Sequence, residues 1–235
     1  MKGLLLRVGI DKGCGGCLSP FFKNGKFEFI PIPEDKETSE TKTYANMKGR
    51  TGCQIGDFVP KRIRCRHPHI DPEFDTFTYG DPTKIKRCQI SQLDPDDLLI
   101  FYAGLQPEKS KTKPRLFVVG YFNVERVYNF DFKKIPLRQH NSALKNLENN
   151  AHAKRYFKTK KYDKNLVIVK GNAKRSKLLS KPLLLGNHKN YMLTRLEPIF
   201  GYKGSLQRAV GHWIDKEHIA QVRKWLRTKG NLSSG

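Results

Sequence analysis

The chain has 235 residues and a formal net charge of +23, from 45 Lys and Arg against 22 Asp and Glu. This length allows a real hydrophobic core, for which 14 Phe, 9 Tyr and 2 Trp supply bulky side chains. The apolar runs are too short to cross a bilayer or to form a secretory signal, and five cysteines do not indicate a disulfide framework. We therefore expect a cytoplasmic protein with reduced thiols and no membrane partner.

The first part of the chain is predicted to contain two short strands and many turns. Leu4–Ile10 and Lys26–Ile32 are apolar runs on either side of a glycine-rich loop, and prolines end the second run. Residues 34–57 are polar, and residues 58–93 carry many turn signals. Such loops on a scaffold often hold functional side chains.

From residue 94 the pattern changes to longer apolar segments that are rich in β-branched and aromatic residues. Helices are expected over residues 139–161, which lack glycine and proline, and over residues 215–229, where apolar residues recur at helical spacing after the candidate N-cap Asp215. The predicted strands are Leu98–Ala103, Arg115–Tyr128 (as an antiparallel pair), Leu166–Val169 and Leu178–Leu185.

These elements predict an α+β fold, with a curved or barrel-like, mainly antiparallel sheet and peripheral helices. We expect a single domain over residues 1–235. Its glycine-loop and turn-rich part covers residues 1–96, and its basic, strand-rich part, which ends in a helix, covers residues 97–235.

The positive charge is concentrated in the second part of the chain. Residues 1–100 hold 16 Lys and Arg and 14 Asp and Glu, a net charge of +2, whereas residues 101–235 hold 29 and 8, a net charge of +21. Lysine enrichment at high temperature is the alternative explanation, but it usually brings glutamate with it. Clustered cations favour a nucleic-acid partner, DNA more than RNA, and we expect no cofactor.

The tract over residues 154–181 holds eleven Lys and Arg, one acidic residue and interleaved aromatic residues. Cations with aromatic rings suit binding along a nucleic-acid backbone with base stacking, whereas a merely solvated face needs no aromatic residues. The residues expected to bind nucleic acid are Lys12, Lys154, Arg155, Tyr156, Lys158, Lys160, Lys161, Tyr162, Lys174, Arg175, Lys177 and Trp213.

The cysteines and nearby histidines could supply four ligands to a metal ion, but the sequence does not favour such a site. Cys14 and Cys17 have the spacing of a metal hairpin, and Cys65 lies near His67 and His69. The Cys-x-His-x-His spacing is not a recognised zinc motif, so we expect no metal. The loop is instead predicted to use its glycines for positive φ angles and close backbone approach to a ligand; these are Gly13, Gly15 and Gly16.

Five polar residues are candidates for catalysis. Asp11 ends the first predicted strand and suits a general base or a hydrogen-bond acceptor for a base edge, or else an Asx-type turn. Tyr79 and Asp81 suit a stacking group and an acceptor in a turn, or else a hydrophobic anchor before a Gly-Asp-Pro turn. His212 and Asp215 suit a proton shuttle and its orienting group, or else an anchor and a helix N-cap.

Four stretches of the chain resemble the third nucleotide-modification-associated domain family. They are Arg7–Gly13 with Gly15 and Gly16, then Phe27–Glu34, Asp71–Pro82 and Asp97–Leu105. Members of that family are associated by genomic context with DNA base modification in phages and prokaryotes, so the resemblance implies a nucleic-acid role without defining a reaction. More weakly, residues 97–185 are similar to PUA-like domains of the EVE and YTH kind, which implies a small β-barrel that holds a modified base. His212 with Asp215 resembles the His/Asp pair of half-pipe restriction glycosylases.

We therefore expect a nucleic-acid-binding protein that acts on DNA bases, by base modification or base excision at flipped nucleotides. The first alternative is a non-catalytic PUA-like reader of modified bases. A nuclease of a restriction or defence system comes after it, because metal-dependent nucleases need clustered carboxylates and residues 101–235 hold only 8 acidic residues. The sequence leaves open whether a partner modification enzyme performs the chemistry, and leaves the oligomeric state open.

Overall fold

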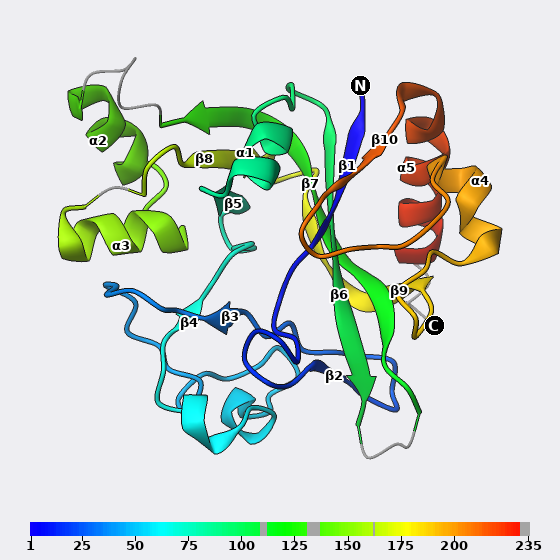
Figure 1. The fold of residues 1–235 in the computed structure, drawn as a ribbon, viewed down its shortest axis with the longest axis horizontal. Helices are drawn as coiled ribbons and strands as arrows, with labels where there is room; N and C mark the ends of the chain where they lie inside the picture. The colour runs from blue at the N-terminus through cyan, green and yellow to red at the C-terminus, as the bar shows by residue number, and fades with distance from the viewer. Residues whose placement is uncertain (109–111, 131–136, 162, 231–235) are drawn as a thin grey trace.

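The computed structural model describes residues 1–108, 112–130, 137–161 and 163–230. Within these ranges, eight strands form one sheet in the order β10-β1-β6-β7-β8-β5, with β2 added on β6 and β9 on β7 (Figure 1). The strands of this sheet are β1 Gly3–Arg7, β2 Ser19–Phe21, β5 Thr78–Asp81, β6 Leu98–Pro107, β7 Arg115–Asn129, β8 Val167–Gly171, β9 Lys177–Gly186 and β10 His212–Ile214.

The smaller elements surround this sheet. β3 (Ile32–Pro33) and β4 (Pro68–His69) form a separate antiparallel pair, to the left of the lower half of β6 in Figure 1. The described helices are α1 Lys84–Ile90, α2 Leu137–Lys145, α3 Ala151–Thr159, α4 Glu197–Phe200 and α5 Lys216–Gly230. Across the described ranges, no helix combines the length and the apolar character that crossing a membrane requires.

The centre of the sheet is the antiparallel pair of β6 and β7. The apolar run from Leu98 to Leu105 is buried throughout, as expected for a strand that is covered on both faces. The first half of β7 pairs with β6 and β9 and its second half with β8, and register shifts interrupt each ladder. Because such irregularities bend a strand, the sheet is curved without closing into a barrel. The predicted α+β fold with a curved sheet is confirmed.

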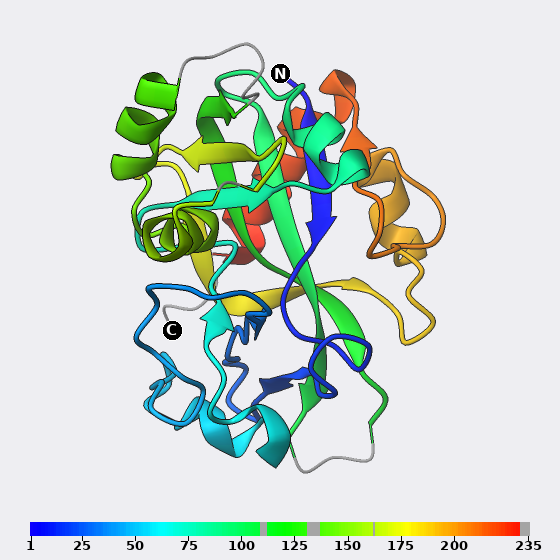
Figure 2. The same cartoon turned by 60° about the vertical axis from the view of Figure 1, so that its left-hand side comes forward.

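Two hydrophobic clusters cover the two faces of the sheet. Ile219, Val222 and Leu226 of α5 pack on one face, and the other face packs around Phe101 and Phe122. Figure 2 shows α5 behind the central strands and α1 in front of them. The three-to-four spacing of apolar residues in α5 thus forms a buried stripe, as the sequence predicts.

The predicted strand over residues 26–32 is wrong except at its last residue, because Ile32 lies in β3. Ile30 donates its backbone NH to the Ser19 hydroxyl at 3.0 Å, and its carbonyl accepts from the Ile10 NH at 2.8 Å. The side chain of Ile30 packs in a cluster with Tyr44 and Ile55. Phe27 forms only an isolated bridge, to Phe21 of β2, and packs with the cluster around Phe101. This apolar run therefore contributes side chains to two cores without forming a regular strand over residues 26–31.

The long central segments also differ from expectation. Residues 115–129 form one strand, β7, whose ladders contain register shifts, in place of the expected antiparallel pair. The expected helix over residues 139–161 is split into α2 and α3, since Asn150 caps α3 by accepting from the His152 NH at 3.0 Å. β5 and α1 were not predicted.

Candidate functional site

Two neighbouring cavities share Arg7 and Arg208 in their linings. The first, of about 230 Å³, is called the inner pocket here, and the second, of about 540 Å³, the loop cavity. Polar residues that line the inner pocket include His69, Asp71, Tyr79, Asp81, Lys86 and His152. Those of the loop cavity include Asp11, Lys12, Cys14, Arg115, His188 and Asn190.

Two histidines and an aspartate from distant parts of the chain meet in the inner pocket. His69 ends β4, Asp71 follows two residues later, and His152 lies in the first turn of α3. Oδ2 of Asp71 lies 3.4 Å from Nε2 of His152 and 3.9 Å from Nε2 of His69. The two imidazole rings meet edge to face with centroids 4.9 Å apart. All three side chains are buried.

The other nitrogen of each histidine bonds to a carboxylate. Nδ1 of His69 lies 2.8 Å from Oε2 of Glu34, and Nδ1 of His152 lies 2.7 Å from Oδ2 of Asp163. Arg155 joins the two carboxylates, with ion pairs of 2.7 Å to Glu34 and 3.1 Å to Asp163. This arrangement fixes the orientation of both rings, because each Nδ1 has a strong acceptor.

The two outer carboxylates are held in their charged form. Burial opposes the charge of Glu34, but hydrogen bonds from His69 and Arg155 lower its pKa to about 2. Burial also opposes the charge of Asp163, yet the bond from His152 and other cationic partners hold the pKa of this carboxyl well below its usual range. Both groups therefore act as permanent acceptors for the histidines.

The two histidines differ in their protonation. Burial dominates at His69 and lowers its pKa, although the bond to Glu34 acts in the opposite direction. Burial also disfavours the charged form of His152, but its hydrogen bond to Asp163 and the nearby charge of Asp71 raise its pKa to about 9. The pocket thus combines a neutral and a readily protonated imidazole, which is a usual combination for proton transfer.

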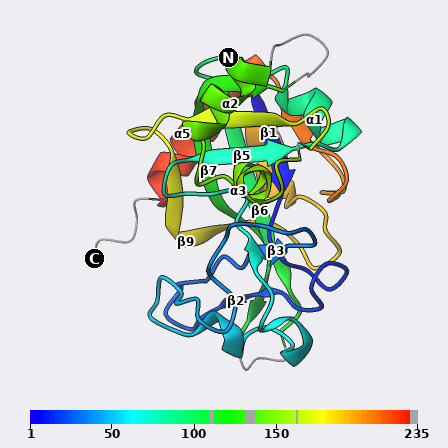
Figure 3. The same ribbon diagram turned by 90° about the vertical axis from the view of Figure 1, so that its left-hand side faces the viewer.

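Backbone contacts with β5 hold this group in place. Both carboxylate oxygens of Asp71 accept from the Gly80 NH, at 2.9 and 3.1 Å. A Cβ atom at Gly80 would lie 2.7 Å from Cδ2 of His152, so only glycine allows this approach. The Asn150 side chain donates to Thr78 Oγ1 at 3.2 Å and ties the start of α3 to β5. Figure 3 shows α3 beside β5 and above β3.

Tyr79 and Asp81 lie together in the inner pocket, on β5 and not in a turn. The Tyr79 hydroxyl donates to Oδ2 of Asp81 at 3.1 Å, and burial together with Asp81 raises the pKa of Tyr79. The Tyr79 ring packs against Phe101 with centroids 5.3 Å apart, and only 4% of the residue is exposed. The core therefore occupies the ring face expected to stack on a base. Burial lowers the pKa of Lys86, which lies in the same pocket, although the charge of Asp81 acts in the opposite direction.

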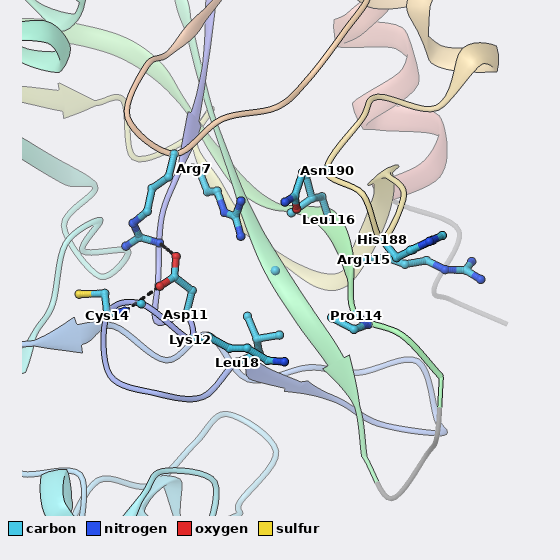
Figure 4. A pocket seen from close by; sticks show the side chains of 13 residues that line it. Arg7, Asp11, Lys12, Cys14, Leu18, Pro114, Arg115, Leu116, His188 and Asn190 are labelled. Carbon is cyan, nitrogen blue, oxygen red and sulfur yellow. Dashed lines mark hydrogen bonds and ion pairs between the residues drawn. The ribbon is translucent and has the colours of Figure 1, made fainter.

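Asp11 lies in the loop cavity and is held by the glycine loop. Its carboxylate accepts from the Cys14 NH at 2.8 Å and forms a 2.8 Å ion pair with Arg208. Figure 4 shows Asp11 and Lys12 on one side of the cavity and Arg115 and His188 on the other. Positive φ angles occur at Gly15 and Gly16, and Gly13 is an exposed residue that lines the cavity.

His212 and Asp215 line neither the inner pocket nor the loop cavity. His212 lies on β10, where its Nε2 accepts from the Gln207 NH at 3.2 Å and its ring contacts Tyr202 at a centroid distance of 4.5 Å. Burial lowers the pKa of His212. Asp215 is exposed at the start of α5, where its backbone carbonyl accepts from the His218 NH at 3.0 Å.

The expected nucleic-acid-binding residues occupy different environments. Arg155 points inward to Glu34 and Asp163, and Tyr156 is half-buried with its hydroxyl bonded to Asn141. Three others are engaged with nearby groups: Lys154 pairs with Glu40, Arg175 pairs with Asp96, and Trp213 is half-buried beneath Lys2. Lys12, Lys158, Lys160, Lys161 and Lys174 are exposed, Lys177 is half-buried, and Tyr162 lies outside the described residues.

Sequence reasoning did not find the constellation around Asp71. The sequence groups His69 only with cysteines, whereas among the described residues the metal-capable group is His69, Asp71 and His152, with no cysteine. The His-x-Asp spacing of His69 and Asp71 is a weak signal, since their partner His152 follows far along the chain. Only the packing of α3 against β5 brings the three together.

Three comparisons relate the chain to known proteins. No curated protein is similar to the chain in sequence. One solved structure, the N-terminal domain of Thermococcus gammatolerans McrB bound to m5C DNA, overlaps 97% of this chain and 99% of that chain. The identity is 12% and the TM-score 0.36, which does not establish a shared fold. The family model described as nucleotide modification associated domain 3 matches residues 2–229, which confirms the resemblance seen in the sequence motifs. The chain therefore belongs to the nucleotide modification associated domain 3 family.

Proposed function

We propose that the protein binds DNA and acts chemically on a nucleotide whose base enters the inner pocket. The observation that carries this proposal is the position of the buried histidine and carboxylate groups directly beside a cavity lined by cations. The pocket and the cavity share Arg7 and Arg208, so one nucleotide can contact both. Membership of a nucleotide modification associated family supports a nucleotide as the ligand.

The loop cavity suits the phosphate groups of this ligand. Arg7, Lys12, Arg115 and Arg208 line it, and Asp11 is its acidic lining residue. Guanidinium groups bind phosphate oxygens in pairs through their fixed fork of donors. The ion pair with Asp11 also holds Arg208 at the boundary with the inner pocket, where the phosphate nearest the base would lie.

The inner pocket suits acid–base chemistry on the base or its glycosidic bond. His152 can donate a proton and His69 can accept one, while Asp81 accepts from the Tyr79 hydroxyl. Base modification and base excision both need such groups, and a base that enters the pocket must leave the helical stack. Asp11 assists by positioning Arg208, whereas this proposal gives His212 and Asp215 no part in the reaction.

Mass analysis of labelled duplex DNA after incubation with the protein tests the proposal. A mass increment indicates modification, and a free base indicates excision. Unchanged DNA that stays bound would replace the proposal with a non-catalytic reader, and a shortened strand would replace it with a nuclease. A nuclease is kept as an outcome because nucleases need carboxylates beside their cationic surface. Glu34 and Asp71 of the turn-rich part lie at the same site as His152 of the basic part.

A matched pair of variants assigns the reaction to the inner pocket. Asp81→Asn keeps an acceptor for Tyr79 but removes the charge, and is expected to lower the rate by at least about a hundredfold, the usual scale for an acid–base group. Asp215→Asn removes an exposed charge outside both cavities and is expected to leave the rate within about threefold of the parent. Equal losses in the two variants would contradict this location.

A further inference from the structure

We infer that His69, Asp71 and His152 form a binding site for one divalent first-row transition-metal ion. The ligand atoms are Nε2 of each histidine and a carboxylate oxygen of Asp71. This inference goes beyond the proposed function, because metal binding is a property of the protein without nucleic acid. With the ion bound, Nε2 of each histidine is a ligand and no longer exchanges a proton, and Asp81 is then the acid–base group of the proposed function.

The ligand atoms already converge. One suitable atom from each residue lies within 4.8 Å of those of the other two, and all three residues are buried. The 3.4 Å separation of His152 Nε2 and Asp71 Oδ2 matches the distance of about 3.4 Å between two ligands of a tetrahedral ion with bonds near 2.1 Å. The 3.9 Å separation at His69 is wider, and both exceed an ordinary hydrogen bond. The spacing therefore suits an ion between these atoms better than direct bonds among them.

The outer hydrogen bonds prepare both histidines as ligands. Nδ1 of His69 faces Glu34 and Nδ1 of His152 faces Asp163, so each ring donates through Nδ1 and directs Nε2 toward Asp71. Metal-binding histidines characteristically donate their second NH to a carboxylate or carbonyl, which fixes the tautomer and raises ligand basicity. A metal ion takes the place of the proton on His152 Nε2, because ligation requires that atom to be unprotonated.

The ligand types select the class of metal. Imidazole nitrogen favours zinc, iron, nickel and copper, whereas magnesium and calcium prefer oxygen. Two histidines and one carboxylate leave coordination positions for water or substrate, as catalytic sites require. All three residues line the inner pocket, so these positions face the space proposed for the base.

Titration of the chelator-treated protein with Co²⁺ tests the inference, because the visible absorption of Co²⁺ reports its coordination. We expect one equivalent to bind, to be displaced by Zn²⁺, and to raise the thermal unfolding temperature. Asp71→Asn and His69→Gln should each weaken binding at least about tenfold, since loss of even an outer-shell partner costs 10–100-fold. Asp57→Asn and His67→Gln, two residues outside the inner pocket, are the matched controls and should bind as the parent does.

A measurement on the unsubstituted protein decides the question if a ligand variant fails to fold. With Co²⁺ bound, proton NMR should show two exchangeable, strongly shifted signals from the Nδ1 protons of His69 and His152. Absence of stoichiometric Co²⁺ binding, or binding that persists in both ligand variants, would overturn the site. So would a thiolate-to-cobalt absorption band that disappears in a Cys14→Ser, Cys17→Ser variant. If metal binds but DNA is never altered, this inference stands and the proposed function fails.

Discussion

Arg155 forms buried ion pairs, although its sequence context indicates a residue that binds nucleic acid. It lies in a lysine-rich segment, yet its guanidinium pairs with Glu34 and Asp163. These two carboxylates are almost fully buried at their side chains, and a buried charge without a partner is costly. Arg155 therefore stabilises the acidic groups behind the histidines, whereas Lys158, Lys160 and Lys161 are exposed.

Of the two glycines that line the inner pocket, Gly9 and Gly80, Gly80 leaves less room for a Cβ atom. Substitution Gly80→Ala would place a Cβ atom 2.7 Å from His152 and 3.2 Å from Ile168. Overpacking of this kind typically costs about 1–3 kcal/mol, so we expect a loss in this range in the free energy of unfolding, measured by urea denaturation. The displaced His152 should also lower activity on DNA.

Gly13→Ala is the matched control for this substitution. Its new Cβ atom would meet only Asp11 Oδ1, at 3.5 Å, which is ordinary van der Waals contact. We expect the free energy of unfolding to change by no more than about 0.5 kcal/mol. Equal losses in the two variants would mean that the contact between Gly80 and His152 does not limit the packing.

At the scale of elements, the site depends on how α3 docks against β5. Asn150 serves both sides of this junction, because it caps α3 through the His152 NH and donates to Thr78 on β5. Asn150→Ala removes both bonds. We expect a loss of about 1–2 kcal/mol in the free energy of unfolding, from thermal or urea denaturation, as for other N-cap residues.

Gln54→Ala provides the comparison for the cap. Gln54 precedes the short 3₁₀ turn Ile55–Asp57 without a capping hydrogen bond from its side chain, and it is exposed. Its replacement should therefore change the free energy of unfolding by less than about 0.5 kcal/mol. A similar loss in both variants would show that the side-chain bonds of Asn150 contribute little.

For the whole molecule, the uneven charge predicts binding that depends strongly on salt. With about six phosphate contacts, affinity for DNA should fall on the order of a thousandfold between 50 and 200 mM salt, because bound cations release counterions. Fluorescence anisotropy over a salt series measures this slope. Affinity that is independent of salt would contradict a phosphate-binding surface.

Two sets of lysine substitutions locate that surface. Replacing the exposed Lys158, Lys160 and Lys161 by Gln should lower the slope by up to about three, because each lysine that binds a phosphate adds about one to it. Replacing the exposed Lys23, Lys48 and Lys61 of the turn-rich part removes the same charge and should leave the slope nearly unchanged. Equal reductions would place the DNA across both parts of the chain.

The sequence by itself determined the fold class, the family and the location of the net charge. The helical spacing of apolar residues identified α5, and an unbroken apolar run identified the central strand β6, which is covered on both faces. Local turn and loop context also singled out Tyr79, Asp81 and Asp11, all of which line the two cavities. These features depend on the local pattern or on the composition, both of which can be read from one segment of the chain without knowing its neighbours in the fold.

Only the tertiary structure decided which side chains lie together. His69, Asp71 and His152 come from a short strand, a loop and a helix, and no spacing rule links them. Burial of the Tyr79 ring against Phe101, and the turn of Arg155 toward Glu34, are likewise consequences of long-range packing. The physical reason is that ligand geometry and pKa depend on distances between segments and on exclusion of water, which arise only when the segments pack.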